Sequence, residues 1–417
     1  MVTIENQFDN EHINHIPNSK SAYICAGDIK ATNFTYLMKL VMLTKNNPHL
    51  INAIHKHKNI INKQNSEGWT ALMLASASSN TISSNETVLE LIKNGADVNI
   101  KENYGISALY FSCGRSNFGS SVDTIRILIN AGANVNDCDS RGTSPLIISS
   151  KYSNYSSTTE TVNELIKAGA NVNHQNNDGL TALMLASRYS NACSNLETIE
   201  LLIKAKANLN IRDNYGGTAL IKACNNLNRE SNYNAVKLLV NAGAALDIQT
   251  YDNTTALMSA CKFPSFECRH DTVDLLISKG ANVNLVDSGG YSALMFACDC
   301  AIIAKKYGIV KALINANANI CYDKIIKANT LEIYNIILDR HRHNHTKIKP
   351  IINHISEKQK EYYCNYKNNV KYLIDINEVQ FELYFYPYNI NFILKQTKHH
   401  NRINKHITTN KFNFLIK

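Results

Sequence analysis

The eleven cysteines carry the most reactive side chains of this 417-residue chain, and their spacing decides which chemistry they could support. A zinc knuckle needs two cysteine pairs with a two-residue gap, whereas the closest pair here, Cys298 and Cys300, has one residue between them and lacks a second pair. One repeated position of the chain carries either cysteine or serine: Cys113, Cys224, Cys261 and Cys298, with Ser76, Ser150 and Ser187 in the other copies. Such a position requires a small side chain rather than a thiol. We therefore expect reduced thiols, no metal and no cofactor.

Acidic and histidine side chains form two further sets that could do chemistry. Glu86, Asp123, Glu160 and Glu197 each follow a serine by three residues, the serines being Ser83, Ser120, Ser157 and Ser194. This is the spacing of a capping box, in which both side chains bond the first amides of a helix, so we interpret the acids as structural. His341, His343 and His345 alternate and could pinch a metal ion, but they have no carboxylate or thiol near them.

No motif of an enzyme stands out beside these sets. The sequence has no glycine-rich phosphate loop, no His-Glu-x-x-His helix and no Gly-x-Ser-x-Gly elbow. The repeat described next also uses the residues that a catalytic site would need. We therefore predict that the protein is not an enzyme.

A period of 37 residues organises the chain, and it determines which elements position these side chains. A Thr/Ser-Ala/Pro-Leu triplet starts at Thr70, Ser107, Ser144, Thr181, Thr218, Thr255 and Ser292. A second series follows at Gly95, Gly132, Gly169, Lys206, Gly243, Gly280 and Asn317, each before alanine. Self-similarity at a fixed period indicates stacked units that complete one another's hydrophobic core.

One unit, residues 65–101, predicts a turn followed by two short helices. Thr70 begins the first helix, and Val88, Leu91 and Ile92 give the second an apolar stripe at helical spacing. Gly95 ends the second helix as a left-handed C-cap. Because so few apolar side chains cannot stabilise one unit alone, we expect neighbours to share a continuous core.

A turn, two antiparallel helices and an exit of the Gly-Ala-Asp/Asn-Val-Asn type resemble the ankyrin repeat, closely so over about residues 63–320. The resemblance implies an all-α solenoid whose turns project as hairpin fingers and line a concave face, and a protein-binding module without catalytic residues. Three features depart from the family. The period is 37 rather than 33, with four extra residues between the helices. The usual Thr-Pro-Leu-His becomes Thr-Ala-Leu-Met at 181–184 and 255–258, with only Pro145 keeping the proline, and the seventh copy is degenerate after Asp299 and lacks the glycine stop. The long uniform repeats and Asn- and Ile-rich composition also resemble ankyrin repeat proteins of giant amoeba-infecting DNA viruses of the mimivirus type.

The period divides the chain into one array with two flanking segments. We expect a lead over 1–27, a divergent N-terminal cap repeat over 28–64, ankyrin repeats over 65–101, 102–138, 139–175, 176–212, 213–249 and 250–286, a degenerate repeat over 287–320, a C-terminal cap over 321–340 and a tail over 341–417.

Positions that vary while the repeat frame holds predict the surface that a partner would contact. Trp, Tyr and Arg most often dominate interface energetics. On this basis we predict partner-binding residues on the fingers at Trp69, Tyr104, Arg141, Arg212 and Tyr215. The alternative is that the long inter-helix loops make the contact, or that these exposed residues serve no function.

The asparagines at the repeat exits occupy the place where ankyrin proteins can be hydroxylated by an asparaginyl hydroxylase. The positions are Asn99, Asn136, Asn173, Asn210 and Asn284. The residues themselves favour a structural role, in which the side chain bonds the finger backbone, over hydroxylation.

The tail over 341–417 is basic, with 13 Lys/Arg against 5 Asp/Glu, and rich in tyrosine. We expect a helix over 361–373, strands at 379–383 and 390–392 that pair across 386–389, and disorder from Lys395. Basic charge with aromatic residues could contact nucleic acid, but we favour a tail whose aromatics form their own core. Viral ankyrin proteins also resemble substrate adaptors that recruit a ubiquitin ligase subunit through a C-terminal box, yet no clear box is present.

Charge and hydropathy indicate in which cellular compartment the protein is expected. The chain before residue 341 is nearly neutral, with 30 Lys/Arg against 29 Asp/Glu, although the whole chain carries +9. No apolar stretch reaches the roughly 20 residues that span a bilayer, and the N-terminus lacks a signal pattern. We therefore expect a soluble monomer without a membrane contact in the cytoplasm, the host cytosol if the protein is viral, with the nucleus left open. The partner would be a protein whose identity the residues do not reveal.

Overall fold

The computed structural model describes residues 33–43, 48–190, 192–225, 233–262, 268–304, 307–320, 333, 336, 370–376, 379–386 and 389–395. The chain forms two compact units. One comprises Met1–Asn226 with Asn234–Ala244, and the other comprises Leu227–Tyr233 with Ala245–Lys417. Each is described by itself.

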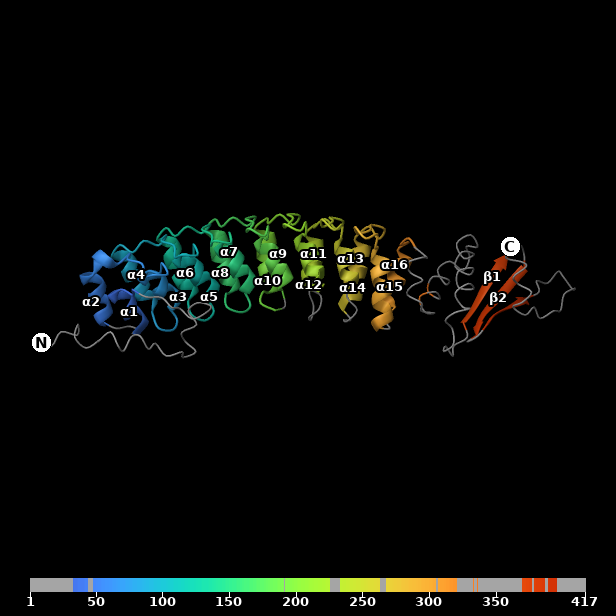
Figure 1. Ribbon diagram of the computed structural model, residues 1–417, viewed down its shortest axis with the longest axis horizontal. Coiled ribbons are helices and arrows are strands. Elements are labelled where there is room, and N and C mark those ends of the chain that lie inside the picture. Colours follow the sequence, from blue (N-terminus) through green and yellow to red (C-terminus); the bar gives the residue numbers. More distant parts are fainter. Residues whose placement is uncertain are drawn as a thin grey trace. The chain divides into compact units, whose positions relative to one another are not determined.

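The first unit consists of antiparallel helix pairs, one pair in each repeat. The helices are α1 (Tyr36–Leu43), α2 (Pro48–Lys56), the 3-10 helix η2 (Lys58–Ile60), α3 (Ala71–Ala77), α4 (Asn85–Lys93), α5 (Ala108–Arg115), α6 (Val122–Asn130), α7 (Pro145–Tyr152), α8 (Thr159–Lys167), α9 (Ala182–Arg188), α10 (Leu196–Lys204), α11 (Ala219–Asn225) and α12 (Tyr233–Asn241). First helices contact first helices, and second helices contact second helices, along the series. Figure 1 shows the inter-helix loops of α5–α10 on the opposite edge of the stack from the segments that connect the repeats.

The second unit contains two more helix pairs and a three-stranded antiparallel sheet. The pairs are α13 (Ala256–Cys261) with α14 (Cys268–Ser278) and α15 (Ala293–Ala304) with α16 (Gly308–Asn315), and the strands are β1 (Val370–Ile376), β2 (Val379–Tyr386) and β3 (Asn389–Lys395), in the order β1-β2-β3. The array is thus all-α, as expected, and the expected strand pair is present, with Phe385 opposite Ile390. The expected helix over 361–373 is wrong at its end, because residues 370–373 begin β1. Residues 361–369, most of the cap over 321–340 and residues beyond Lys395 lie outside the described residues.

The first helices α3, α5, α7 and α9 each begin at the Thr or Ser of the repeated triplet. Thr70 accepts a hydrogen bond from the Met73 amide at 3.2 Å, and Thr181 does the same for Met184. The hydroxyl satisfies an amide that has no partner within the helix. The prediction that Thr70 begins a helix is confirmed.

The second helices begin one residue later than the capping-box spacing predicted. Their N-caps are Ser84, Ser121, Thr158 and Asn195, each of which accepts from the amide of a threonine three residues on. The predicted cap serines Ser83, Ser120, Ser157 and Ser194 are buried instead. The acids therefore occupy the second helical position. Their negative charge still interacts favourably with the positive end of the helix dipole, but the prediction of a reciprocal capping box is wrong.

The second helices end where the sequence predicted. Gly95 has φ +95° and donates to the Ile92 carbonyl at 3.0 Å, while Ala96 donates to the Leu91 carbonyl at 3.0 Å, which is a Schellman C-cap. Lys206 and Asn317 replace the glycine in two repeats and adopt the same left-handed conformation, with φ +61° and +62°. The last repeat therefore ends its second helix without glycine.

The core of the helical repeats lies between the two layers of helices. In α4, Val88 and Leu91 are fully buried, and the Cys113 and Ser150 side chains are fully buried at the position that alternates between cysteine and serine. Burial raises the pKa of Cys113, and it raises the pKa of Cys298 to about 12, so both thiols stay protonated at neutral pH. These cysteines act as small core side chains. No helix in the described ranges is long and apolar enough to cross a membrane.

The lengthened inter-helix loops are hydrogen-bonded to one another. The Asn80 amide donates to the Gly119 carbonyl at 3.0 Å, and the same bond recurs from Asn117 to Ser156 and from Asn154 to Cys193. Buried hydroxyl pairs run beneath them at 2.6–2.7 Å, namely Ser79 with Thr124, Ser116 with Thr161 and Ser153 with Thr198. The four extra residues per repeat thus form an ordered edge that adds contacts between repeats.

Candidate interaction surface

Each finger is held by one side chain at its base. The Asp139 Oδ1 accepts from the amides of Arg141 at 3.0 Å and Thr143 at 2.7 Å, closing the turn around itself. The same pair of bonds recurs at Asn65, Glu102, Asn176, Asp213 and Asp287. Because these side chains replace water as the partner of the turn amides, the fingers are rigid before any partner binds.

The finger tips of neighbouring repeats are bonded through their backbones. The Ser140 amide donates to the Tyr104 carbonyl at 2.7 Å, and equivalent bonds join Asn103 to Glu67, Asn177 to Arg141 and Asn214 to Asp178. This close approach needs glycine at the turn. A Cβ on Gly68, whose φ is +84°, would lie 2.8 Å from the Asn103 amide nitrogen. The tips therefore form one continuous row within the first unit, which we call the finger row (residues 67, 104, 141, 178 and 215).

Three of the five predicted partner-binding residues project from the finger row. The exposed fraction is 62% for Tyr104, 74% for Tyr215 and 78% for the Arg141 side chain. Arg141 Nη2 lies 3.4 Å from Asp139 Oδ2, and the same carboxylate accepts from the Tyr110 hydroxyl at 3.1 Å. Asp139 therefore orients an arginine whose charge remains in solvent.

The other two predicted residues have structural contacts. Trp69 is only 5% exposed, and its ring stacks on Phe111 of the next repeat with centroids 4.2 Å apart. Arg212 is exposed, yet its Nε donates to the Gly216 carbonyl at 3.2 Å, so it also braces its own finger. Gln64 and Gln175 make this bond at the same repeat position. Tyr104, Arg141 and Tyr215 are thus the most accessible of the predicted set, with Arg212 beside them.

The exit asparagines bridge adjacent repeats. The Asn136 Oδ1 accepts from the Asn171 amide at 2.7 Å, and its Nδ2 donates to the Gly169 carbonyl at 3.4 Å. Asn99 makes both bonds to the following repeat, and Asn173 and Asn284 each accept from an amide there. Asn210 is exposed at the same repeat position. The structural interpretation of these asparagines fits the geometry, and their hydroxylation stays a prediction.

Burial perturbs one acid at the base of the fingers. Burial raises the pKa of Glu102, the hydrogen bonds from the Ile106 and Tyr104 amides oppose this rise, and the negative charges of Glu67 and Asp139 add to it. In the repeat that carries Tyr215, Lys222 forms an ion pair with the buried Asp213. Three finger bases therefore carry buried carboxylates, at Glu102, Asp139 and Asp213, while two of the tips offer tyrosine rings and one offers the Arg141 guanidinium.

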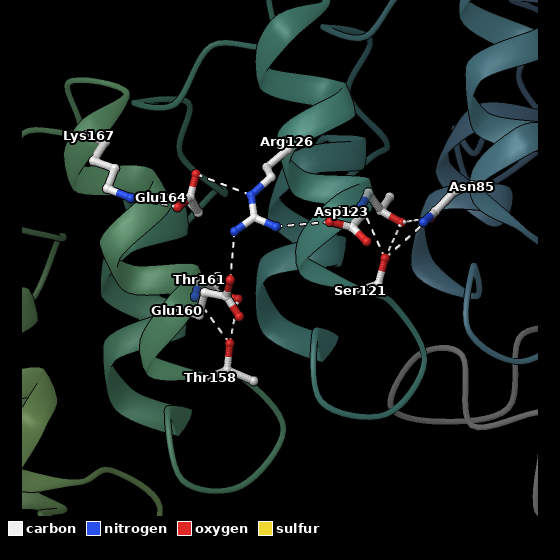
Figure 2. Close-up of polar contacts among 10 residues, drawn as sticks. Asn85, Ser121, Asp123, Arg126, Thr158, Glu160, Thr161, Glu164 and Lys167 are labelled. Carbon is white, nitrogen blue, oxygen red and sulfur yellow. Dashed lines mark hydrogen bonds and ion pairs between the residues drawn. The ribbon is translucent and has the colours of Figure 1, made fainter.

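A second polar cluster joins the outer helices α6 and α8 (Figure 2). Arg126 contacts Asp123 at 2.9 Å in its own helix, and it contacts Glu160 at 2.6 Å and Glu164 at 3.4 Å in the next. The pKa of Glu164 is lowered first by Lys167 and then by Arg126, and burial opposes this. Because each carboxylate of the cluster pairs with a cation and most of these groups are exposed, the cluster ties repeats together rather than forming a chemical site.

The structure also exposes aromatic residues that the sequence reasoning did not single out. Phe118 and Tyr155 lie at the same position of the loops after α5 and α7, and they are 58% and 60% exposed. Their recurrence 37 residues apart was the available signal. Within the described ranges, no cluster of three or more His, Cys, Asp or Glu side chains could hold a metal ion.

The finger row, the paired helices and the exit bonds are the features of an ankyrin stack, and comparison with known families agrees. The family model of ankyrin repeats, built of three copies, matches residues 77–159, 154–250 and 228–324. These matches cover more than half of the chain, so the protein belongs to the ankyrin repeat family.

Proteins with a similar sequence include viral ankyrin repeat proteins. Ankyrin repeat protein L91 of Acanthamoeba polyphaga mimivirus is 43% identical over 94 residues, which is 20% of this chain and 15% of L91. Protein L289 of the same virus is 48% identical over 75 residues, which is 16% of this chain and 14% of L289. The matched segments thus span about a seventh of each relative. Among solved structures, the ankyrin repeat domain of Bcl-3, a member of the IkappaB family, has a TM-score of 0.48 and 23% identity, covering 60% of this chain and all of that domain.

Proposed function

We propose that this protein is a non-enzymatic scaffold that binds a protein partner through the finger row. Membership of the ankyrin family supports an interaction role in general. The observation that carries the specific proposal is that Tyr104, Arg141 and Tyr215 project from tips that are bonded to one another. Because the backbone of the tips is already fixed, binding costs little backbone entropy, and Tyr and Arg are residue types that dominate interfaces.

The chemistry of the row favours a partner with both apolar and acidic groups. Tyr104 and Tyr215 offer flat rings with a polar tip, and Arg141 between them offers a guanidinium that pairs with a carboxylate. Asp178, which lies between Arg141 and Tyr215 along the row, would repel an acidic group at that step. A partner with a carboxylate facing Arg141 and apolar groups facing the two tyrosines therefore fits the row best.

The similarity to mimivirus proteins supports a partner met in an infected amoeba, and a working site in the host cytosol. Ligase recruitment or nucleic-acid contact through the tail stay predictions, since they depend on side chains outside the described part of the chain.

The test is affinity capture from amoebal lysate with immobilised full-length protein. A triple variant Tyr104→Ala, Arg141→Ala, Tyr215→Ala should lose the captured partner, because each anchor side chain contributes on the order of 1–2 kcal/mol at an interface. Leu89→Ala, an exposed change on α4 away from the fingers, is the matched control and should capture normally. Unchanged capture by the triple variant, with an unchanged circular dichroism spectrum, would refute the proposal.

A further inference from the structure

The tips of the finger row repeat with a constant step. One backbone bond joins each tip to the next, from the amides of residues 103, 140, 177 and 214 to the carbonyls of residues 67, 104, 141 and 178, at 2.7–3.1 Å. The tips lie on the segments between the helix pairs, which follow one edge of the first unit in Figure 1. Because helices of adjacent repeats pack about 8–10 Å apart, neighbouring tips present their side chains at about that interval.

The backbone of two central tips is already hydrogen-bonded throughout. In residues 139–143 and 176–180, every amide and every carbonyl has a partner within the protein. The Gly142 carbonyl, for example, is bonded by the His174 Nε2 at 2.8 Å. Main-chain bonds give affinity when an extended peptide adds to a strand, and these tips have none to offer. Recognition by the finger row therefore depends on its side chains.

Four of these side chains form a mixed series. In the order of the repeats, they are the Tyr104 ring, the Arg141 guanidinium, the Asp178 carboxylate and the Tyr215 ring, and all four are exposed. Asp178 forms no ion pair with another residue in the described part of the chain. The contact of Arg141 with Asp139 uses Nη2 at 3.4 Å, and a guanidinium has five N–H donors, so donors remain for a partner's carboxylate.

An α-helix is the element that meets these four side chains in step. Its own amides and carbonyls are bonded within the helix, so it needs none from the fingers. Residues seven apart lie about 10.5 Å apart along the axis, and a helix inclined by about 20° to the row advances about 10 Å per heptad. The drift of about 20° per heptad keeps four such residues within about 30° of the direction of the row.

We propose that the partner presents a single α-helix of about 22 residues, about 33 Å long, which lies along the finger tips. This inference rests on the function proposed above for the finger row, and it adds the structure and the pattern of the partner. At heptad spacing, the helix carries an apolar residue against Tyr104, an acidic residue against Arg141, a basic residue against Asp178 and an apolar residue against Tyr215.

The two charged tips fix the register of such a helix. A shift by one heptad in one direction places the acidic residue of the helix against Asp178. A shift in the other direction places its basic residue against Arg141. Because either shift juxtaposes like charges, only one register pairs both charges, and the tyrosines then receive the apolar residues.

The test uses fluorescence anisotropy with the full-length protein and a fluorescein-labelled peptide of about 24 residues. The peptide has Leu, Glu, Lys and Leu at heptad spacing in a background of Ala and Gln, which favour a helix. The wild type should bind it about tenfold more tightly than a peptide of the same composition in which the four residues are five apart and point around the helix. Leu89→Ala, on α4, is the matched control and should bind as the wild type does. Circular dichroism verifies that each variant folds and that the two peptides are equally helical.

A charge reversal at residue 178 tests the register. The wild type should prefer the Glu-Lys peptide over a peptide with Glu at both charged positions by about fivefold. Asp178→Lys should reverse this preference, because the second glutamate then faces a lysine. Asp178→Asn removes the charge at nearly constant size and should show a smaller preference than either.

Four results would each overturn the helix proposal. They are equal binding of the two spacings, an unchanged preference in Asp178→Lys, no binding of the helical peptide by the wild type at about 1 mM, and tighter binding of a proline-containing extended peptide that carries the same four side chains at every third residue. The function of the finger row is judged separately, since it fails only if the triple variant still captures its partner from lysate.

Discussion

The indole of Trp69 stacks on the ring of Phe111 in the next repeat, with centroids 4.2 Å apart and planes at 29°. The single tryptophan of the chain therefore joins two repeats at the base of their fingers and is 5% exposed. Trp69 packs beneath the finger tips as a buried residue, whereas the rings of Tyr104 and Tyr215 are exposed to solvent.

Replacing Trp69 should lower the stability of the repeats that it joins. Trp69→Ala removes a buried ring and is expected to lower the free energy of unfolding by about 3–5 kcal/mol. Tyr104→Ala, at an exposed tip, should change it by less than about 0.5 kcal/mol. Urea unfolding monitored by circular dichroism measures both. Equal effects of the two changes would mean that Trp69 is not a packing residue.

The left-handed residue at position 206 is a place where the protein can be stabilised. Lys206 holds φ +61°, a conformation that costs a side chain about 1 kcal/mol relative to glycine. Lys206→Gly should therefore raise the free energy of unfolding by about that amount. Gly169→Ala is the reverse change at φ +86°, where an added Cβ meets nothing within 4 Å. It should lower stability by about 1–2 kcal/mol, and a gain in stability would contradict the C-cap assignment.

The asparagine bridge predicts a ranking of variants at residue 136. Asn136→Ala loses the bonds to the Asn171 amide and the Gly169 carbonyl, so it should cost about 1–2 kcal/mol of unfolding free energy. Asn136→Asp keeps the acceptor and should cost less, because Asp247 accepts from the Asn282 amide in the same way. Thermal unfolding measures the ranking, and equal losses would show that the acceptor is unimportant. Mass spectrometry of protein isolated from cells tests hydroxylation as a gain of one oxygen atom.

Glu102 and Glu164 should make the stability of the protein depend on pH in opposite directions. The pKa of Glu102 is raised in the folded state, so its ionisation lowers stability as pH rises through the interval between its unfolded and folded pKa values. Glu102→Gln should therefore be stabilising at pH 7, with a smaller gain below about pH 4, the ordinary range of a glutamate. The pKa of Glu164 is lowered, so its contribution is present at pH 7 and is lost as pH falls. Glu164→Gln should be mildly destabilising at pH 7, and the same sign for both variants would contradict the account.

The repeat register explains why most of the fold could be predicted and why particular positions could not. The period placed the helix pairs, the Thr70 cap and the Gly95 stop, because each depends on local chemistry. The second-helix caps were placed one residue early because polar residues stand side by side, as at Ser83 and Ser84, and burial against the neighbouring repeat decides between them.

The candidate site shows the same limit. The sequence predicted Tyr104, Arg141 and Tyr215 as finger residues, and they are exposed there. It could not show that Trp69 faces Phe111, which lies 42 residues away in the chain, because that depends on how two fingers pack. In the tail, residues 370–373 have a pattern that also suits a helix, and pairing with β2 makes them a strand.

Hydrogen–deuterium exchange of the full-length protein, alone and with its captured partner, tests the finger row most directly. The account predicts slowed exchange of backbone amides in the fingers around Tyr104, Arg141 and Tyr215, with the amides of α4 and α8 unchanged. Protection confined to the second helices, or to segments beyond residue 320, would contradict it.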